Sequence, residues 1–302
     1  MLPETPGNDP LDIPVSPVRR RLLAVGQATA FAFLTVVLWF LMIWLLRGQT
    51  WVENALILSV VSLAPAVVVA HTVFVLFNPS VSWNAIGLSC SPRGLVELTA
   101  GILSGAAIAL AVVGALWTLG WIVVDQGSAP TVGEEEVIWA PGWLHACMIL
   151  FLGASSEELL FRGFGLQQLI RATNSWIAII GTSVIFGLLH AGNPSASEVS
   201  LVNTALFGCL FGFLLVRRRS LMTPIGVHFG WNFTLVATGV SLSGLRIKLV
   251  DVTLTSTGPA LWSGGPYGPE ASLLTSLAIP IVIGVVLCWP PKSNTEPRRL
   301  WD

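Results

Sequence analysis

Two adjacent glutamates and an arginine interrupt an otherwise apolar part of the chain. The stretch Glu157-Glu158-Leu-Leu-Phe-Arg162 lies between apolar runs at residues 143–153 and 176–189. An ionisable side chain at membrane depth costs several kcal/mol unless it is paired or hydrated, so such residues are functional candidates. Glu158 and Arg162 are four residues apart and share a helix face, which lets them form an ion pair. Glu157 is rotated by about 100° from Glu158, so its carboxylate can face a reaction centre.

Two further polar clusters follow on separate apolar segments. Residues 186–190 read Phe-Gly-Leu-Leu-His, and residues 228–232 read His-Phe-Gly-Trp-Asn. The four-residue spacing places Phe186 beside His190, and His228 beside Asn232, on one face of each helix. The three segments together supply a free carboxylate, two imidazoles and an amide.

This set of groups suits hydrolysis of an amide bond. A carboxylate can take a proton from water and pass it to the leaving amine. Histidine and asparagine can donate hydrogen bonds to the oxyanion of the tetrahedral intermediate. The same carboxylate and two histidines could instead hold a zinc ion that activates water. A serine–histidine arrangement is less attractive, because no local pattern marks Ser155 or Ser156 as a nucleophile.

Each cluster alone also has a structural interpretation. The Glu158–Arg162 pair could join helices, and His190 could end its helix, because a turn-forming Ala-Gly-Asn-Pro sequence follows it. His228 and Asn232 could form ordinary hydrogen bonds between helices. Three clusters on three segments together favour a functional site.

The composition indicates what kind of protein positions these residues. Hydrophobic residues make up 54% of the chain and charged residues 10%, against roughly 25% charged in a soluble domain. A membrane-spanning helix needs about 20 mainly apolar residues. The expected fold class is therefore an all-α polytopic membrane protein with about eight transmembrane helices. The segments are 22–46, 54–77, 96–124, 143–171, 175–190, 199–216, 221–241 and 271–289.

The chain is expected to form one membrane-embedded unit with short tails. Residues 1–21 are interpreted as a disordered cytoplasmic tail, and residues 290–302 as a second cytoplasmic tail. Three N-terminal helices occupy residues 22–124, a catalytic helical core occupies 143–241, and a final helix occupies 271–289. The four cysteines are far apart and form no CxxC pair, so they predict neither a disulfide nor a metal site. No basic groove suggests a nucleic-acid partner.

The basic residues predict the orientation. With the N-terminus inside, 12 of the 15 lysines and arginines fall on the cytoplasmic face, which carries the excess of such residues in membrane proteins. The three on the outer face are Arg47, Arg246 and Lys248. Both termini are therefore expected in the cytoplasm. Thr223-Pro224 is interpreted as the N-cap and first residue of a helix that starts at that face. His228 would then be shallow, which favours substrate access from the cytoplasm or the inner leaflet.

The three motifs in this order, EExxxR, FxxxH and HxxxN, resemble a family of intramembrane proteases. This is the CAAX-protease and bacteriocin-processing family (CPBP, also called Abi), which includes the CAAX prenyl endopeptidases. The resemblance covers residues 143–241, about a third of the chain. It implies an all-helical endopeptidase with a cavity open to the cytoplasm and Glu157 as its catalytic glutamate. The other site residues that it implies are His190, His228 and Asn232, with Glu158 and Arg162 as a supporting pair.

The predicted function is an intramembrane endopeptidase that hydrolyses a peptide bond near the cytoplasmic leaflet, with CAAX-type prenylprotein processing as the implied activity. Glu157 would activate water, while His190, His228 and Asn232 position it and stabilise the oxyanion. No cofactor is required by this mechanism; Zn²⁺ on Glu157, His190 and His228 is the metal-dependent alternative.

The implied partners are a protein or peptide substrate, lipid-modified if the CAAX resemblance extends that far, and membrane lipid. The expected location is a multi-pass position in the membrane, the plasma membrane in a bacterium. The alternative of another class is a non-proteolytic immunity or scaffold protein that retains the protease fold. A transporter is less favoured, because it would show two related halves with broken helices.

Overall fold

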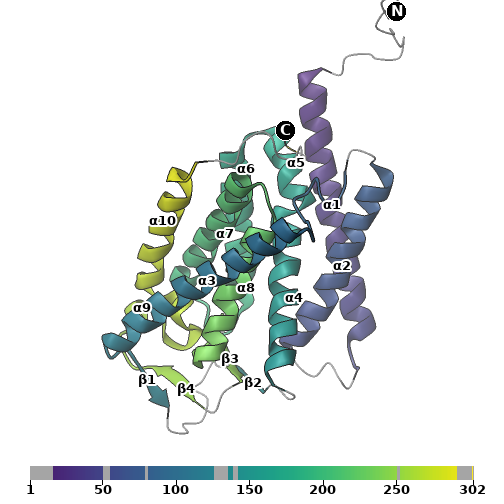
Figure 1. The fold of residues 1–302 in the computed structure, drawn as a ribbon. Helices are drawn as coiled ribbons and strands as arrows, with labels where there is room; N and C mark the ends of the chain where they lie inside the picture. Colours follow the sequence, from purple (N-terminus) through teal and green to yellow (C-terminus); the bar gives the residue numbers. More distant parts are fainter. Residues whose placement is uncertain are drawn as a thin grey trace, which may run out of the picture.

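A computed structural model describes residues 16–49, 55–78, 81–125, 135–138, 142–249, 252–290 and 301. The expected tails therefore lie mostly outside the described residues. The eight main helical segments follow the eight apolar segments of the sequence (Figure 1). They are α1 (Pro17–Leu46), α2 (Ala55–Phe77), α3 (Pro92–Thr118), α4 (Trp143–Arg162) with α5 (Phe164–Ala172), α6 (Ser175–Leu189), α7 (Glu198–Arg218), α8 (Met222–Thr238) and α10 (Leu273–Cys288).

The described part of the chain contains six helical stretches that are long and apolar enough to cross a membrane, and α10 is a shorter apolar helix. The protein is thus a predominantly helical, multi-pass integral membrane protein, as the composition predicted. The remaining helical elements are single turns: η1 (His190–Gly192), α9 (Ala260–Ser263), η2 (Gly265–Tyr267) and η3 (Pro269–Ala271).

Four short strands, which the sequence did not predict, lie together beyond one end of the helices (Figure 1). Strands β1 (Ile122–Asp125) and β4 (Thr253–Ser256) pair antiparallel, and β2 (Glu135–Ile138) and β3 (Leu245–Lys248) pair parallel. We call this end of the bundle the strand end. The opposite end carries Arg171 in the last turn of α5 and Arg217–Arg219 at the C-terminus of α7, and we call it the arginine end.

The fourth apolar segment is not one long helix, as the sequence suggested, but breaks at Gly163. The first backbone N–H of α5, on Phe164, donates to His71 Nε2 of α2 at 3.2 Å instead of continuing the α4 ladder. The other ring nitrogen of His71, Nδ1, donates to the Val67 carbonyl at 2.8 Å, which fixes the acceptor role of Nε2. The break therefore depends on a side chain from another helix.

Helix α8 starts differently from the prediction. It begins at Met222 with Leu221 as N-cap and without a side-chain cap, so the assignment of Thr223 as N-cap was wrong. The Leu221 N–H donates to the Gly87 carbonyl at 2.9 Å, and the Thr223 hydroxyl donates to Glu97 of α3 at 2.9 Å. Tertiary partners thus replace the local cap at this terminus.

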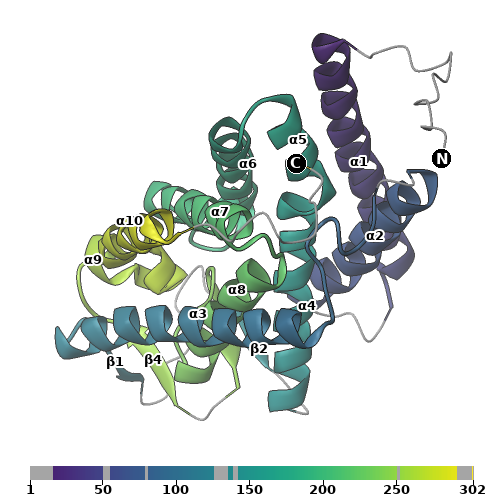
Figure 2. The same ribbon diagram turned by 45° about the horizontal axis from the view of Figure 1, so that its top comes forward.

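Glycines let α3 and α8 pack at backbone contact, which fixes the position of α8. A Cβ atom on Gly105 of α3 would lie 2.1 Å from the Val227 carbonyl oxygen. A Cβ atom on Gly230 of α8 would lie 2.2 Å from the Ile102 carbonyl oxygen. Only glycine permits such an approach. Figure 2 shows α3 lying across α8.

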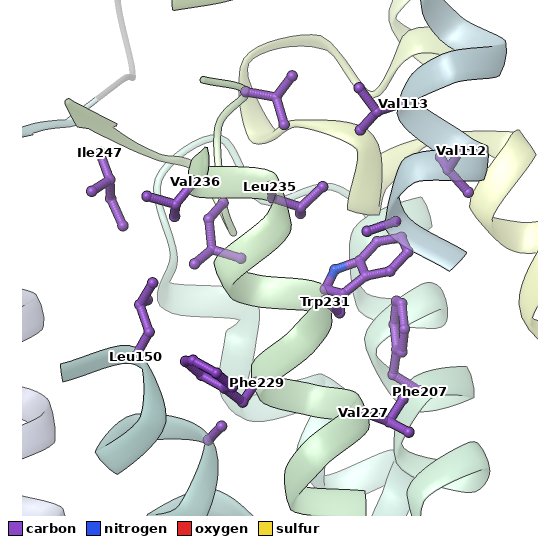
Figure 3. Close-up of a cluster of buried hydrophobic side chains, with 14 of the residues drawn as sticks. Val112, Val113, Leu150, Phe207, Val227, Phe229, Trp231, Leu235, Val236 and Ile247 are labelled. Atoms are coloured by element: carbon purple, nitrogen blue, oxygen red, sulfur yellow. The ribbon is translucent and has the colours of Figure 1, made fainter. Parts of the chain in front are cut away.

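Two clusters of buried apolar side chains fill the bundle. The first gathers residues of α3, α4, α7 and α8, and Figure 3 shows Trp231 and Phe207 at its centre. Their ring centroids are 4.7 Å apart. The second cluster joins α1, α2, α5 and the starts of α3 and α8, and includes Ile86, Phe164 and Leu221. Most of the buried apolar residues that line the candidate site, among them Leu150, Phe207 and Trp231, belong to the first cluster.

Candidate active site

The Glu158–Arg162 ion pair forms within α4 and is fully buried. Arg162 Nη1 lies 3.2 Å from Glu158 Oε1, and the two side chains are 1% and 0% exposed. Arg162 Nη2 also donates to the Gly208 carbonyl of α7 at 2.9 Å, and its guanidinium lies 4.7 Å from the centroid of the Phe186 ring. The arginine thus ties α4 to α6 and α7.

His228 lies between the two glutamates, an arrangement that the sequence did not reveal. Its Nδ1 is 3.0 Å from Glu158 Oε1, and its Nε2 is 3.8 Å from Glu157 Oε2. A carboxylate only accepts hydrogen bonds, so Nδ1 carries a proton, and Nε2 is the ring nitrogen that faces Glu157. The ring stacks on Phe211 of α7 with centroids 4.9 Å apart. Glu158 therefore orients His228 besides pairing with the arginine.

His190 ends α6 and has its tautomer set in the same way. Its Nδ1 lies 2.8 Å from the Phe186 carbonyl oxygen, one helical turn earlier. A carbonyl oxygen also only accepts, so Nδ1 is the donor and Nε2 is the free acceptor. The Phe186 ring makes edge contacts with both histidines, at centroid distances of 4.7 Å to His190 and 6.3 Å to His228.

One cavity of about 350 Å³ brings the predicted residues together. Its lining includes Glu157, His190, His228 and Asn232. Ser155 and Ser156 are not among the lining residues that the structure describes, and the Ser156 hydroxyl donates to the Leu152 carbonyl of its own helix. The serine alternative thus has no geometric support.

The cavity extends from mid-bundle toward the strand end. Part of its apolar lining lies within helices, such as Ala154 of α4 and Phe207 and Phe211 of α7. Further lining comes from the first turns of α2, the turn after α6, the segment before β3 and the segment before α10. These contributors include Leu56, Ser59, Asn193, Ser243 and Glu270. All of these segments lie at the strand end.

Glu270 is a second carboxylate in the cavity lining, beside Glu157, and sequence reasoning missed it. It accepts hydrogen bonds from the Ser243 N–H at 2.6 Å, the Ser243 hydroxyl at 2.8 Å and the Trp231 indole at 3.2 Å. Burial raises the pKa of this carboxyl, and the hydrogen bonds from Ser243 oppose that rise. Glu270 lies outside the three motifs, in a Gly-Pro-rich connection, so no helical spacing pointed to it.

The metal alternative can be tested against the same geometry. Both histidines hold Nδ1 on an oxygen acceptor and leave Nε2 free, which is the usual arrangement of a metal-binding histidine. In the described part of the chain, however, no three His, Cys, Asp or Glu side chains are grouped closely enough to hold a metal ion. The described residues as arranged do not fit a three-ligand zinc site.

Comparisons with known proteins agree with the resemblance drawn from the motifs. Residues 138–234 match the family described as type II CAAX prenyl endopeptidase Rce1-like. The uncharacterized protein YyaK of Bacillus subtilis (strain 168) is 22% identical over 180 residues, which is 58% of this chain and 56% of YyaK. The chain thus matches little more than half the length of this relative.

The family match contains Glu157, His190, His228 and Asn232, and it implies a membrane-embedded peptidase. The predicted resemblance to CAAX-type intramembrane proteases is confirmed at this level. Glu270 lies beyond the matched residues.

Proposed function

We propose that the protein is an intramembrane endopeptidase in which Glu157 activates water. The observation that carries the proposal is the convergence of Glu157, His190, His228 and Asn232 from α4, the end of α6, and α8 on one cavity. Burying so many ionisable groups is costly in a membrane protein. Hydrolysis of a peptide bond needs such groups around a space that water and substrate can occupy.

Glu157 has the geometry of a general base. Its side chain is 31% exposed, whereas that of neighbouring Glu158 is fully buried. Its Oε2 has no hydrogen-bond partner among the described residues and faces His228 Nε2 at 3.8 Å. A water bound beside this carboxylate can lose one proton to it while its other hydrogen is donated to the lone pair of one histidine Nε2.

The remaining groups complete a balanced hydrolysis. The water oxygen bonds to the carbonyl carbon, and the Asn232 amide donates a hydrogen bond to the oxyanion that forms. Glu157 then returns the proton to the nitrogen of the leaving amine as the C–N bond breaks. The products are a carboxylic acid and an amine, which together keep both hydrogens of the water, and no further reactant is needed.

The supporting pair acts on His228 rather than on the substrate. Glu158 holds the proton on Nδ1 of His228, and Arg162 neutralises the charge of Glu158. This chain of contacts keeps Nε2 facing the cavity. Glu158 and Arg162 are therefore proposed as positioning residues.

The test compares new protein N-termini in cells that express the wild type, Glu157→Gln or Glu198→Gln. Glu198 is the exposed first residue of α7 and does not line the cavity, so it controls for the same chemical change. We expect a set of N-termini that appears with wild type and Glu198→Gln and disappears with Glu157→Gln. An identical set in all three would leave the non-proteolytic scaffold as the better account.

The metal alternative has its own measurement. The metal content of the purified protein, and its activity after chelation, test whether Glu157, His190 and His228 need an ion. Activity retained in a metal-free preparation supports the mechanism above. Loss on chelation with recovery on zinc addition would contradict it.

A further inference from the structure

The two ends of the bundle differ sharply in basic residues. Among the described residues, the arginine end carries eight arginines and the strand end carries two arginines and a lysine. The arginine-end residues are Arg19, Arg20, Arg21, Arg93, Arg171, Arg217, Arg218 and Arg219, and those at the strand end are Arg47, Arg246 and Lys248. An excess of arginine and lysine marks the cytoplasmic face. The arginine end is therefore the cytoplasmic one.

The cavity opens away from that face. Its deepest polar residues, Glu157 and His228, lie in mid-helix, and the rest of the lining runs to Pro194, Ser243 and Glu270 at the strand end. The described connections at the arginine end, residues 81–91, 173–174 and 219–221, contribute nothing to the lining.

The arginine end of the site is closed by packed side chains. The segment before α3 lies across it, because Gln167 Nε2 donates to the Ile86 carbonyl at 2.7 Å and the Leu221 N–H donates to the Gly87 carbonyl at 2.9 Å. Ile86, Gln167 and Leu221 are each 0% exposed. Water or a peptide coming from the cytoplasm would have to displace this layer before reaching Glu157.

The strand end, in contrast, forms a polar mouth. Glu270 binds Ser243 and Trp231 through its carboxylate, and its backbone carbonyl accepts from Asn203 Nδ2 at 2.7 Å. Asn193 Nδ2 lies 3.5 Å from the Tyr267 hydroxyl. These contacts join the described connections of the strand end beside the cavity, and they offer polar groups to a peptide backbone.

We infer that the cavity is reached from the non-cytoplasmic side, and that the substrate is a peptide segment exposed on that side of the membrane. Such segments belong to exported or membrane-anchored proteins. The inference rests on the proposed peptidase function and revises the access route expected from the sequence. A prenylated C-terminus in the cytoplasm would face the closed end of the site.

Thiol accessibility tests the access route without requiring catalysis. The full-length protein is expressed in bacterial cells with Cys147, Cys209 and Cys288 replaced by alanine, leaving the exposed Cys90 as a reporter at the arginine end. Thr204→Cys places a thiol in the cavity lining, and Ala196→Cys places one in the turn after α6. Each variant is treated with a membrane-impermeant maleimide before and after permeabilisation.

We expect Thr204→Cys and Ala196→Cys to be labelled in intact cells and Cys90 only after permeabilisation. Labelling of Thr204→Cys only after permeabilisation, together with Cys90, would overturn the access route. Labelling of Ala196→Cys without any labelling of Thr204→Cys would also overturn it, because the cavity would then be closed to outside water.

The positions of the Glu157-dependent N-termini test the substrate class. They should fall in segments on the non-cytoplasmic side of the membrane. Cleavage confined to cytoplasmic C-termini would overturn this substrate class while leaving the peptidase intact. Absence of any Glu157-dependent cleavage would instead refute the proposed function, whatever the accessibility result.

Discussion

The arginine end and the strand end of the bundle differ in whether their polar side chains are packed or face a cavity. Around Arg162 and Gln167, polar side chains are fully buried, and the donors Arg162 Nη1 and Gln167 Nε2 bind a carboxylate and a backbone carbonyl. Gln167 Oε1 and Glu158 Oε2 have no partner among the described residues, but neither residue lines the cavity. Around Glu157, polar groups face a cavity, and Glu157 Oε2 lacks a partner among the described residues. The first arrangement stabilises; the second leaves hydrogen-bonding capacity for a reactant.

The difference is the basis for proposing different roles for two neighbouring glutamates. Glu157 and Glu158 are identical in type and adjacent in sequence, yet one is 31% exposed and the other 0%. The helix rotation of about 100° between them turns one toward the cavity and the other toward the packed interior. In the proposed mechanism, the buried glutamate positions His228 and the accessible one acts as the base.

The largest effect is expected from a substitution of Glu157, which faces the cavity. Glu157→Gln removes the proposed base while keeping shape and volume, so the cleavage rate should fall by about 10²- to 10⁴-fold. Thermal unfolding in detergent should stay close to wild type, because this carboxylate is partly exposed. Glu198→Gln is the control, and wild-type cleavage by Glu157→Gln would refute the assigned role.

The next-largest effect is expected from a substitution that breaks the buried Glu158–Arg162 ion pair. Arg162→Ala leaves Glu158 as an unpaired buried charge, which should lower the free energy of unfolding by about 3–5 kcal/mol. Arg171→Ala makes the same change at an exposed position and should stay within about 0.5 kcal/mol. Denaturation in detergent measures both. Equal stability of the two variants would mean that the buried pair contributes nothing.

A double substitution separates the effect of the ion pair on stability from its effect on His228. Glu158→Leu with Arg162→Met replaces the pair by apolar groups and should regain much of the lost stability. It should not regain activity, because the Nδ1 proton of His228 then lacks its acceptor. Recovery of both stability and cleavage would show that the tautomer of His228 does not depend on Glu158.

A smaller effect is expected where backbone contact positions α8. Gly105→Ala forces a methyl group against the Val227 carbonyl and should cost about 1–3 kcal/mol of stability. Gly114→Ala, in the same helix, meets open space and should be neutral or stabilising. Comparing their unfolding midpoints isolates the close approach. Similar midpoints would mean that α3 and α8 separate without cost.

The smallest effect is expected from Glu270, in the cavity lining at the strand end, and it concerns the pH dependence of stability. The folded protein raises the pKa of Glu270, so it binds this proton more tightly than the unfolded chain does. The stability from this group is present below the unfolded pKa, about 4.3, and is lost as pH rises through the folded pKa. Glu270→Gln should therefore flatten this part of the stability–pH curve. An unchanged slope between the two proteins would refute the contribution.

The sequence by itself determined which helices form and which residues could do chemistry. Apolar runs of membrane-spanning length specify helices locally, because a bilayer requires every backbone polar group to be bonded within the segment. The four-residue spacing of Glu158 and Arg162 likewise determined their ion pair. Periodicity and hydrophobicity are local properties, so no knowledge of the fold was required.

Tertiary structure decided what depends on residues far apart in the chain. His71 ends α4 by accepting the Phe164 N–H from 93 residues away, and His228 reaches Glu158 across 70 residues. Glu270 joins the cavity from a connection that carries no periodic signal. The end at which the cavity opens follows from how these segments pack, and the charge pattern alone could orient the bundle but could not locate the opening.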